Sequence, residues 1–545
     1  MFRARDLRER GISDKLPCIG YPHSRVSPAN KEKQMNLNRR NFLFGSAAAT
    51  ALAGCSTAKV GTRKLAPGEK ANVALIGFGI QGRSALMPQF VDQYKLGAQV
   101  VVVCDCDKER REAGAKMVDE AYAKRKITDV PKCRAVADFR DVLKDPMIDM
   151  VCIATPDHWH AYIAVEAMKA GKDVYCEKPL TFNVDEARKV IAAQEKYGRV
   201  FQTGSMQRSW DVFRTAVMIV RNGIIGDVKY VDANYGRGGQ KLGGPSHPVR
   251  FFDEPKNAAT EGAPNPSVDW DMWLGPCKWR PYSDQLAPRG VNKFYPMFWR
   301  FDDDIGTGYN GDWGAHHLDI AQWGLDMDKS GPYKIICSDE PYSTDLFHGG
   351  RRQFGMKMLF HTKTGDVELY HGPFGVWGTV FYGTNGIVAV NRGKIAVWQG
   401  TGLVKPNAEI RQKLQDVTFM KDKIVAESVG KAYKDTETSV KKDNRLEAAL
   451  AKLKETFKLD TAPVQLYKSP NQVQNFVECY FSRNLTISPA EVGGRGAVLC
   501  QLCNMSYVYD TGFDWDPVKM DFANGTGKGI SLKRDFCRNG WEVVV

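Results

Sequence analysis

A glycine-rich turn between an apolar strand and a helix constrains the fold of this 545-residue chain more than any other feature. The stretch Asn72–Ile76 has the length and apolar character of a buried strand, and it leads directly into Gly77-Phe-Gly79-Ile-Gln-Gly82. In such a turn, glycines allow a tight bend and a close approach of the backbone to a pyrophosphate, which then lies at the N-terminus of the next helix. Alone, the motif is weak, because short glycine spacings also arise by chance.

A carboxylate at the end of the next strand strengthens this interpretation. The run Val100–Cys104 is typical of a strand and ends at Asp105. This residue comes roughly 20 residues after Gly82, where a dinucleotide-binding domain carries the carboxylate that binds the adenosine ribose. Because a carboxylate there repels a 2′-phosphate, NAD is the predicted cofactor. Lys108 and Arg110 lie just beyond and keep NADP as an alternative.

Strands and helices continue to alternate along the chain, as parallel strands joined by crossover helices require. The further strands of this first region are expected at residues 148–154, 173–176 and 200–202. The sequence therefore predicts a doubly wound parallel sheet, an NAD-binding Rossmann domain, over residues 71–204, with a polar linker at 56–70 before it. From residue 205 the pattern changes to that of a second α/β domain, which extends to residue 545.

The N-terminus has the layout of a secretory signal. Arg39-Arg40 and the residues after them are close to a twin-arginine export motif, and the apolar stretch that follows is shorter than the roughly 20 residues that span a bilayer. The Leu-Ala-Gly-Cys sequence ending at Cys55 resembles a bacterial lipobox, in which the cysteine is lipidated. We therefore expect export to the periplasm or outer membrane with a lipid anchor, a cytoplasmic protein with an alanine-rich helix being the alternative. Met35 directly precedes the signal, so residues 1–34 are interpreted as a mis-assigned start.

Composition argues against two classes of partner. The net charge of +13 would suit nucleic acid, but nearly half of it lies in the first 55 residues, and the sequence has no compact basic stripe with interleaved aromatic residues. The thirteen cysteines are not spaced as a disulfide framework. Cys500 and Cys503 form a CxxC without a second pair in a helical stretch, which favours packing in the core. We expect neither a nucleic-acid partner nor a bound metal.

Three further motifs point to a known family. Thr155–His160 (TPDHWH) follows the strand at 148–154, Glu177–Pro179 (EKP) follows the next strand, and Gly311–Asp319 (GDWGAHHLD) comes later. With the glycine turn, their order and separation resemble the glucose–fructose oxidoreductase/inositol dehydrogenase/MocA (Gfo/Idh/MocA) family. The similarity covers roughly residues 71–328 and 465–517.

The resemblance implies a fold and a set of site residues. In that family a Rossmann domain precedes an α/β domain whose open, mostly antiparallel sheet forms the floor of the site. The matching catalytic residues are Lys178, Asp312 and His316. The predicted cofactor-binding residues are Gly77, Gly79, Gly82, Asp105, Thr155, Pro156, His158, Glu177 and Lys178. The candidate substrate contacts are His160, Arg208, Tyr235, Tyr309 and His317.

The residue types support those roles independently. On a helix Asp312, His316 and Asp319 would share one face. A histidine can take a hydroxyl proton near neutral pH, and a lysine ammonium beside the carbinol oxygen would stabilise a developing alkoxide. The alternatives are a surface lysine at 178, a core histidine at 316, or a metal site that adds His317. His158 and His160 either contact the substrate or fix their loop. Nearby aromatic residues suit stacking on a sugar ring.

Location and chemistry together constrain the function. Free NAD is not expected outside the cytoplasm, so an exported enzyme must carry its cofactor and regenerate it in place. One prediction is an oxidoreductase acting on a sugar, polyol or glycoside hydroxyl. A second is a redox-neutral glycosidase, which oxidises C3 transiently, eliminates the aglycone, adds water and reduces the sugar again. The third is a non-catalytic sugar-binding lipoprotein. Residues 405–460 are predicted to form a charged helical insertion, and open-faced sheets of this family often pair, which leaves a homo-oligomer open.

Overall fold

The computed structural model describes residues 63–235, 265–291, 298–341, 354–371, 378–400, 402, 405–407, 410, 425–427 and 444–545. The export signal, residues 1–34 before it, the lipidation site Cys55 and most of the predicted insertion at 405–460 lie outside these residues. Lys59–Val545 cluster as one compact unit. Among the described helices, none combines the length and apolar character that crossing a bilayer demands.

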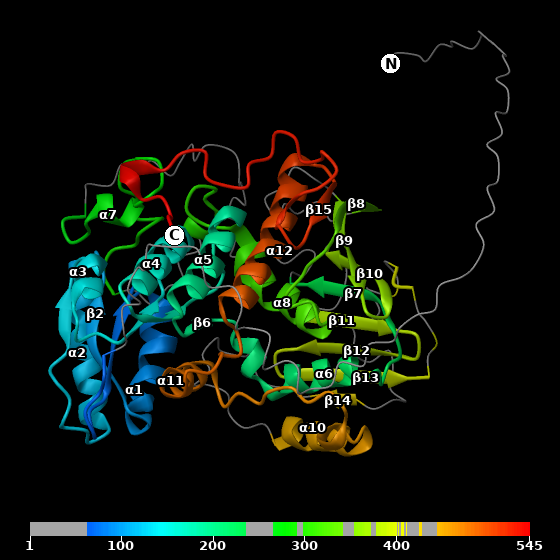
Figure 1. Cartoon of the computed structure of the whole chain (residues 1–545), viewed down its shortest axis with the longest axis horizontal. Helices are drawn as coiled ribbons and strands as arrows, with labels where there is room; N and C mark the ends of the chain where they lie inside the picture. Colours follow the sequence, from blue (N-terminus) through cyan, green and yellow to red (C-terminus); the bar gives the residue numbers. More distant parts are fainter. Residues whose placement is uncertain are drawn as a thin grey trace, which may run out of the picture. The chain divides into compact units, whose positions relative to one another are not determined.

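The first region is built on a six-stranded parallel sheet in the order β3-β2-β1-β4-β5-β6. Its strands are β1 Ala71–Ile76, β2 Ala98–Cys104, β3 Arg134–Val136, β4 Met150–Ile153, β5 Asp173–Cys176 and β6 Phe201–Thr203. Its helices are α1 Met87–Asp92, α2 Lys108–Lys124, α3 Phe139–Lys144, α4 Asp157–Lys169 and α5 Val184–Tyr197, with a π-turn η1 Gln81–Leu86 before α1 and a short 3₁₀ helix η2 Gln93–Leu96 after it. β1, β2, β4 and β5 are buried along their whole length, because helices cover both faces of the sheet (Figure 1). The predicted doubly wound sheet is confirmed.

The second region contains a ten-stranded sheet in the order β14-β13-β12-β11-β7-β10-β9-β8-β15-β16. Its strands are β7 Val228–Asn234, β8 Lys334–Pro341, β9 Phe354–Thr362, β10 Gly365–His371, β11 Gly378–Gly383, β12 Gly386–Asn391, β13 Lys394–Gln399, β14 Val425–Glu427, β15 Phe513–Asp516 and β16 Asp521–Phe522. β7 and β10 pair in parallel, and the other neighbours pair antiparallel. The mostly antiparallel sheet implied by the family resemblance is thus confirmed.

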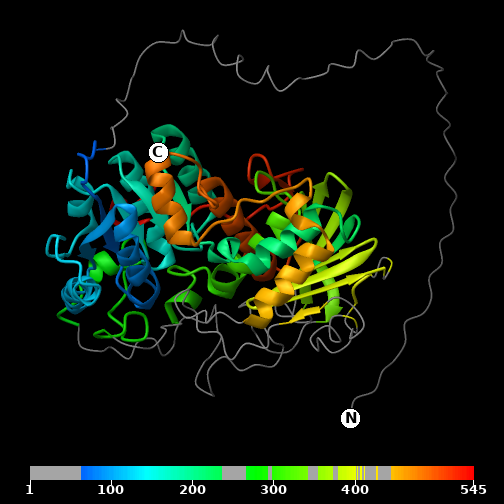
Figure 2. The same cartoon turned by 90° about the horizontal axis from the view of Figure 1, so that it is seen from below.

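The remaining described helices lie from residue 206 onward. They are η3 Met206–Ser209, α6 Asp211–Arg221, α7 Trp270–Leu274, η4 Phe298–Phe301, η5 Asn310–Gly314, α8 Ala315–Gly324, α10 Asn444–Thr456, η8 Leu459–Thr461, α11 Gln472–Ser482, α12 Ala490–Tyr509 and η9 Arg538–Gly540. Figure 2 shows the same elements from a second direction. Within the predicted helical insertion, α10 is a helix, but Val425–Glu427 forms β14 and pairs with β13, so that region is not helical throughout.

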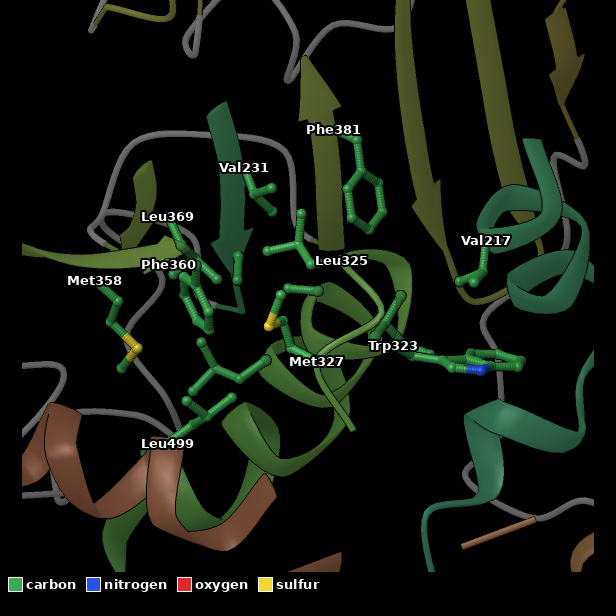
Figure 3. Close-up of a cluster of buried hydrophobic side chains, with 14 of the residues drawn as sticks. Val217, Val231, Trp323, Leu325, Met327, Met358, Phe360, Leu369, Phe381 and Leu499 are labelled. Carbon is green, nitrogen blue, oxygen red and sulfur yellow. The ribbon is translucent and has the colours of Figure 1, made fainter. Parts of the chain in front are cut away.

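The core of the second region lies between the ten-stranded sheet and α6, α8 and α12. Figure 3 shows Val231 and Phe381 from β7 and β11 close to Leu325 at the end of α8, with the Trp323 ring extending toward Val217 and Leu499 of α12 on the other side. These side chains are at most 7% exposed, and burying each contributes roughly 1.5–3 kcal/mol. The packing fixes α8 on the sheet, and the residues just before and within α8 form one wall of the site.

One helix from the second half of the chain, α11, packs into the core of the first region. Val473, Phe476 and Val477 of α11 are fully buried in a cluster with residues of β1 and β2. Arg483 at the end of this helix pairs with Asp173 at the start of β5. The Rossmann sheet therefore gains a helix that lies outside the interval predicted for its domain.

Candidate active site

A cavity of about 540 Å³ runs from the carboxyl ends of the Rossmann strands to the second region. Its lining includes the turn after β1, the ends of β2, β4 and β5, and residues of η5, α8 and the β12–β13 turn. β1 and β4 are neighbours whose connections run in opposite directions, and ligands of open α/β sheets bind at such a switch point.

The glycines of the turn after β1 have distinct roles. Gly77 has a φ of +89°, and a Cβ there would lie 2.7 Å from the backbone of Ala154 and Thr155. Gly82 packs so closely on the carbonyl oxygen of Gly77 that a side chain would collide with it. Gly79 lines the cavity, and a Cβ there would have no protein atom within 4 Å. Gly77 and Gly82 thus form the turn, while Gly79 leaves space for a pyrophosphate to approach the backbone.

Asp105 follows β2 directly and lines the cavity. Its two carboxylate oxygens accept hydrogen bonds from the backbone N–H groups of Phe78 (2.7 Å) and Asp107 (2.9 Å), which fix the side chain beside the glycine turn. Burial raises the pKa of this carboxyl group. The position suits the ribose contact expected from the sequence, so the residues present fit a dinucleotide.

Lys178 and Asp312 form the polar centre of the cavity. The Lys178 Nζ donates to Asp312 Oδ1 at 2.6 Å and to the backbone oxygen of Asp312 at 2.8 Å. The peptide bond between Lys178 and Pro179 is cis. The other carboxylate oxygen of Asp312 lies 3.4 Å from Arg300 Nε. Burial alone would raise the pKa of Asp312, but the charges of Lys178 and Arg300 hold it at about 2.

Glu177 precedes this lysine and lies on its cofactor side. Its carboxylate accepts from Gln81 Nε2 (3.1 Å) and from the backbone N–H of Lys178 (3.2 Å). Burial raises its pKa. Glu177 therefore links the helix after the glycine turn to the lysine at the centre of the cavity.

His316 lies one turn beyond Asp312, at the start of α8, and also lines the cavity. Burial, and then the charges of Arg392 and Lys178, lower its pKa well below the usual value. Its imidazole is therefore neutral at ordinary pH, the form that can accept a proton.

The motif glycine Gly314 lies against Tyr235, whose hydroxyl would be 2.8 Å from an added Cβ, so a side chain at this position would collide with the Tyr235 hydroxyl unless that ring moved.

The two histidines of the TPDHWH motif hold the loop structure. His158 Nε2 donates to the carbonyl oxygen of Trp273 (3.0 Å), and His158 is not among the residues that line the cavity. His160 lines the cavity, but its ring nitrogens lie 2.7 and 2.9 Å from the carbonyl oxygens of Pro179 and Thr155. The geometry favours the loop-fixing alternative for both. Thr155 and Pro156 line the cavity as expected.

Three of the five predicted substrate contacts lie away from the cavity. Arg208 is 1% exposed and forms ion pairs with Asp319 (2.8 Å) and Asp328 (2.7 Å). Arg208 is not among the residues that line the cavity, because two buried carboxylates hold the guanidinium. This pairing also explains why Asp319 does not join Asp312 and His316.

Tyr235 and His317 lie behind the wall of the site. Tyr235 is fully buried and donates to Asn310 Oδ1 (2.6 Å), and His317 stacks on it with the ring centroids 6.3 Å apart. Neither residue is part of the cavity lining, so this geometry does not bring the two predicted substrate contacts to the cavity. Tyr309, in contrast, does line the cavity. In the described residues, no group of three His, Cys, Asp or Glu side chains is arranged to hold a metal ion.

Residues 265–291, here called the cap segment, cover the adenosine end of the cavity. Met272, Trp273, Leu286, Ala287 and Pro288 of this segment face residues of the Rossmann domain across the cavity. In Figure 1, α7 of the cap segment lies beside α3 and α4.

Two of the arginines in the lining were not identified from the sequence. Arg300 precedes the DWG motif in a short 3₁₀ helix, and Arg392 lies in the turn between β12 and β13. Arg300 stands in a Trp-Arg-Phe run, and only the aromatic residues of this run were considered, as candidates for stacking on a sugar ring. Arg392 occurs in Asn-Arg-Gly, an ordinary hairpin turn, and local sequence carries no signal that this turn reaches the site.

Comparison with known proteins matches this architecture. Residues 71–205 match the model of an oxidoreductase family with an NAD-binding Rossmann fold, and residues 250–357 match the C-terminal α/β domain of the same oxidoreductases. The fold thus combines an NAD-binding Rossmann domain with a second α/β domain, as the two matched models describe. These two regions of the chain are thus similar to the Gfo/Idh/MocA oxidoreductases.

Several curated proteins are similar over part of their length. An uncharacterized oxidoreductase, ORF334, of Rhizobium meliloti is 32% identical over 29% of this chain and 44% of its own. Glycosyl hydrolase family 109 protein 2 of Shewanella sp. (strain ANA-3) is 31% identical over 36% and 46%. Inositol 2-dehydrogenase 1 of Mycolicibacterium vanbaalenii is 30% identical over 28% and 41%. The chain thus spans less than half the length of these relatives. A solved aldose–aldose oxidoreductase from Caulobacter crescentus is 14% identical with a TM-score of 0.47, covering 82% of this chain and all of that one.

Proposed function

We propose that this protein oxidises and reduces a hydroxyl-bearing carbon of a sugar, polyol or glycoside, with an NAD that stays bound between turnovers. The convergence of Lys178, Asp312 and His316 on one cavity that also contains the glycine turn is the observation that carries the proposal. NAD, held by the turn and by Asp105, would supply the acceptor for the hydrogen removed from carbon.

The three proposed catalytic residues divide the proton chemistry. Asp312, whose pKa is about 2, is ionised and fixes the Lys178 ammonium at the cavity wall. The ammonium stabilises negative charge on the substrate oxygen as its proton leaves, and it polarises the carbonyl group in the reverse direction. His316, neutral because burial and nearby cations lower its pKa, accepts that proton.

The cap segment supports the retention of the cofactor. Its backbone pairs with the residues after β2, through Lys108 N–H to Ser267 O (2.8 Å) and Asp269 N–H to Cys106 O (3.1 Å). Arg110 donates to the carbonyl oxygen of Pro288 at 2.6 Å. These bonds join the cap to the strand end that would hold the adenosine ribose, so we expect the cap to slow the release of the nucleotide.

The C-terminal tail holds the middle of the cap segment. Arg538 donates from its backbone and from Nε to the carbonyl oxygens of Pro276 and Cys277, each at 3.1 Å, and pairs with Asp271. Trp541 packs against Trp159 of α4 with the ring centroids 4.9 Å apart. A cofactor enclosed in this way must be regenerated in place, as an exported enzyme would need.

A redox-neutral glycosidase is the second candidate. The similarity to proteins named as glycosyl hydrolase family 109 favours it. Such a cycle also leaves the bound cofactor unchanged after each turnover, which suits a cofactor that stays bound. It needs an additional base near C2 of the sugar. Tyr309 lines the cavity, whereas the ring nitrogens of His160 are engaged by backbone carbonyls, so Tyr309 is the better candidate of the two.

One experiment tests the proposal and separates the two candidates. The purified protein is incubated with a panel of glycosides and free sugars, without added cofactor, and the products are analysed. Paired oxidised and reduced sugars support the oxidoreductase, and aglycone release without net oxidation supports the glycosidase. A protein that carries and binds no NAD would contradict both candidates. An NAD-loaded protein that forms no product from any compound would also contradict both, and it would support the non-catalytic sugar-binding lipoprotein instead.

We also propose that the chain is exported by its twin-arginine signal and anchored through a lipid on Cys55. The sequence of residues 36–55 supports this part of the proposal. Cell fractionation with metabolic fatty-acid labelling tests it, with Cys55→Ala as the matched control. Label on the wild type but not on Cys55→Ala is expected, whereas unlabelled wild-type protein in the cytoplasm would contradict it.

A further inference from the structure

The C-terminal tail, residues 530–545, crosses from the second region of the molecule to the Rossmann domain. In Figure 1 this red end of the chain runs from the side of β15 to α7. Leu532 packs against the core of the second region, and its carbonyl oxygen accepts from the backbone N–H of Asp185 in the first turn of α5 (2.9 Å). Two residues further on, Arg534 pairs with Asp304 at 2.8 Å. The tail is thus fixed to both regions before it reaches the cap segment.

Arg538 fastens the tail to the cap segment. Its backbone N–H and its Nε bind the carbonyl oxygens of Pro276 and Cys277, and its Nη2 donates to the carbonyl oxygen of Asp271 at 2.9 Å. The guanidinium also pairs with the Asp271 carboxylate, to which Asn539 Nδ2 donates at 3.3 Å. Arg538 therefore engages both α7 and the turn that follows it.

Trp541 anchors the end of the tail among aromatic residues of the Rossmann domain. Its ring centroid lies 4.9 Å from that of Trp159, 5.1 Å from that of Tyr162 and 6.1 Å from that of Phe139. Val543, two residues further on, is 8% exposed and belongs to the same core as Phe139 and Trp159. Phe139 and Trp159 line the cavity, so Trp541 supports this wall from behind.

The cap lies directly on the residue that Trp541 supports. Trp159 Nε1 donates to the carbonyl oxygen of Met272 at 3.1 Å, and a Cβ on Gly275 would lie 2.3 Å from the Trp159 ring. Arg538 holds the cap and Trp541 holds α4, and three residues of chain span at most roughly 10 Å. The cap can therefore move far from α4 only if one of these two anchors is released.

We propose that residues 538–545 act as a latch whose release limits the exchange of the bound NAD. This inference rests on the proposed function, in which the cofactor stays bound between turnovers. Arg538 and Trp541 are not among the described residues that line the cavity, so the latch controls how often the cap opens rather than what the nucleotide contacts. If the same opening precedes entry and exit, a weaker latch raises both rates equally and leaves the Kd unchanged.

Nucleotide exchange in the full chain tests the inference. Protein loaded with NADH is mixed with a large excess of NAD, and the loss of the fluorescence of bound NADH gives the dissociation rate constant. Nucleotide-depleted protein mixed with NADH gives the association rate constant, and a separate titration gives the Kd. NADH is excited directly, because some of the variants change the tryptophan content.

Two variants weaken the latch at its two anchors. Trp541→Ala and Arg538→Met should each raise both rate constants by about 10- to 100-fold, because truncating an aromatic or arginine anchor of a packed contact has effects of this size. Trp541→Phe keeps a ring and should exchange more slowly than Trp541→Ala. Phe536→Ala is the matched control for the loss of a ring, since Phe536 is a half-exposed residue of the same tail, and Lys533→Met is the control for the loss of an exposed charge. Both controls should exchange as the wild type does.

The inference is overturned if both latch variants fold and exchange NADH at the wild-type rate. It is also overturned if dissociation alone accelerates and the Kd rises, since these residues would then shape the pocket rather than its opening, or if Phe536→Ala exchanges as fast as Trp541→Ala. Should Trp541→Ala fail to fold, Arg538→Met carries the same test.

Turnover of sugars and glycosides by the same proteins separates this inference from the proposed function. Faster exchange in the latch variants of a protein that oxidises none of these compounds would contradict the proposed function alone. Sugar oxidation combined with wild-type exchange in both latch variants would contradict this inference alone. A chain that binds no NADH would contradict both.

Discussion

At the cofactor end of the cavity, the principal groups follow parallel strands within short motifs, whereas at the substrate end they come from segments far apart in the chain. Gly79, Asp105 and Glu177 each lie within three residues of the end of a strand in one sheet. Arg300, His316 and Arg392 lie on a 3₁₀ helix, an α-helix and a hairpin turn. A local motif can thus encode one end, but the other end depends on how the second sheet and its helices pack.

The two ends also differ in which groups interact with their charged side chains. Near the glycine turn, backbone N–H groups hold Asp105 and Glu177. At the substrate end, side-chain cations act on His316 and on Asp312. We therefore expect substitutions at the substrate end to change rate and pH dependence, and substitutions at the cofactor end to change nucleotide affinity.

The largest expected effect is at His316. His316→Gln removes the proposed proton acceptor, and such a group typically contributes about 10²–10⁴-fold, so kcat should fall by that factor. The NAD content of the purified protein, measured by absorbance after denaturation, should not change, because His316 belongs to the other end. Wild-type kcat in this variant would show that another residue takes the proton.

Substitution of Arg208 tests whether this residue stabilises the substrate end or contacts the substrate. Arg208→Met leaves Asp319 and Asp328 without their buried partner, which should lower the free energy of unfolding by about 3–5 kcal/mol. The matched control is Arg188→Met, whose half-exposed ion pairs with Asp185 and Asp521 should cost at most about 1 kcal/mol. Denaturant unfolding measures both variants. A stable Arg208→Met protein with a raised KM would restore Arg208 as a substrate contact.

The glycine turn offers a matched pair at the cofactor end. Gly77→Ala forces a side chain onto a residue with φ of +89° and against the backbone of Ala154, so both thermal stability and NAD affinity should fall, the affinity by about tenfold or more. Gly79→Ala meets no protein atom, so it should weaken NAD binding while the melting temperature of the nucleotide-free protein stays the same. Equal loss of stability in the two variants would contradict the separate roles given to these glycines.

The smallest expected effect is the pH dependence from Asp312. Because its pKa is lowered from 3.8 to about 2, the ionised group stabilises the folded protein above about pH 4, and this contribution is lost as the pH falls from about 4 to about 2. A difference of that size corresponds to about 2 kcal/mol. Unfolding experiments across this range should show the loss in the wild type and a flatter profile in Asp312→Asn. Parallel profiles would show that Lys178 and Arg300 do not stabilise the carboxylate.

The same contrast explains what the sequence could predict. Strand–helix alternation and the glycine spacing correctly predict the first sheet, because each signal is local. The mostly antiparallel second sheet and the grouping of Lys178, Asp312 and His316 were expected from family resemblance, and in the structure these three residues line one cavity. Local patterns did not reveal β12 and β13, whose turn carries Arg392 to the cavity.

Failures of prediction have physical causes too. Arg208 was a candidate substrate contact, but its burial depends on Asp319 and Asp328, more than a hundred residues away. His158 and His160 have the residue type of catalytic groups, yet carbonyl oxygens of Trp273, Thr155 and Pro179 engage their rings. Residue type alone does not distinguish a side chain that faces a cavity from one that holds the loop around it.

The most direct test of the account follows hydrogen from substrate carbon. The NAD-loaded protein is mixed with a sugar substrate deuterated at its ring carbons, quenched within the first turnover, and its coenzyme is analysed by mass spectrometry. The account predicts that the coenzyme gains one deuterium in the wild type and that Lys178→Ala and His316→Gln slow this transfer. Product formed while the coenzyme stays unlabelled would contradict the chemistry proposed for Lys178, Asp312 and His316.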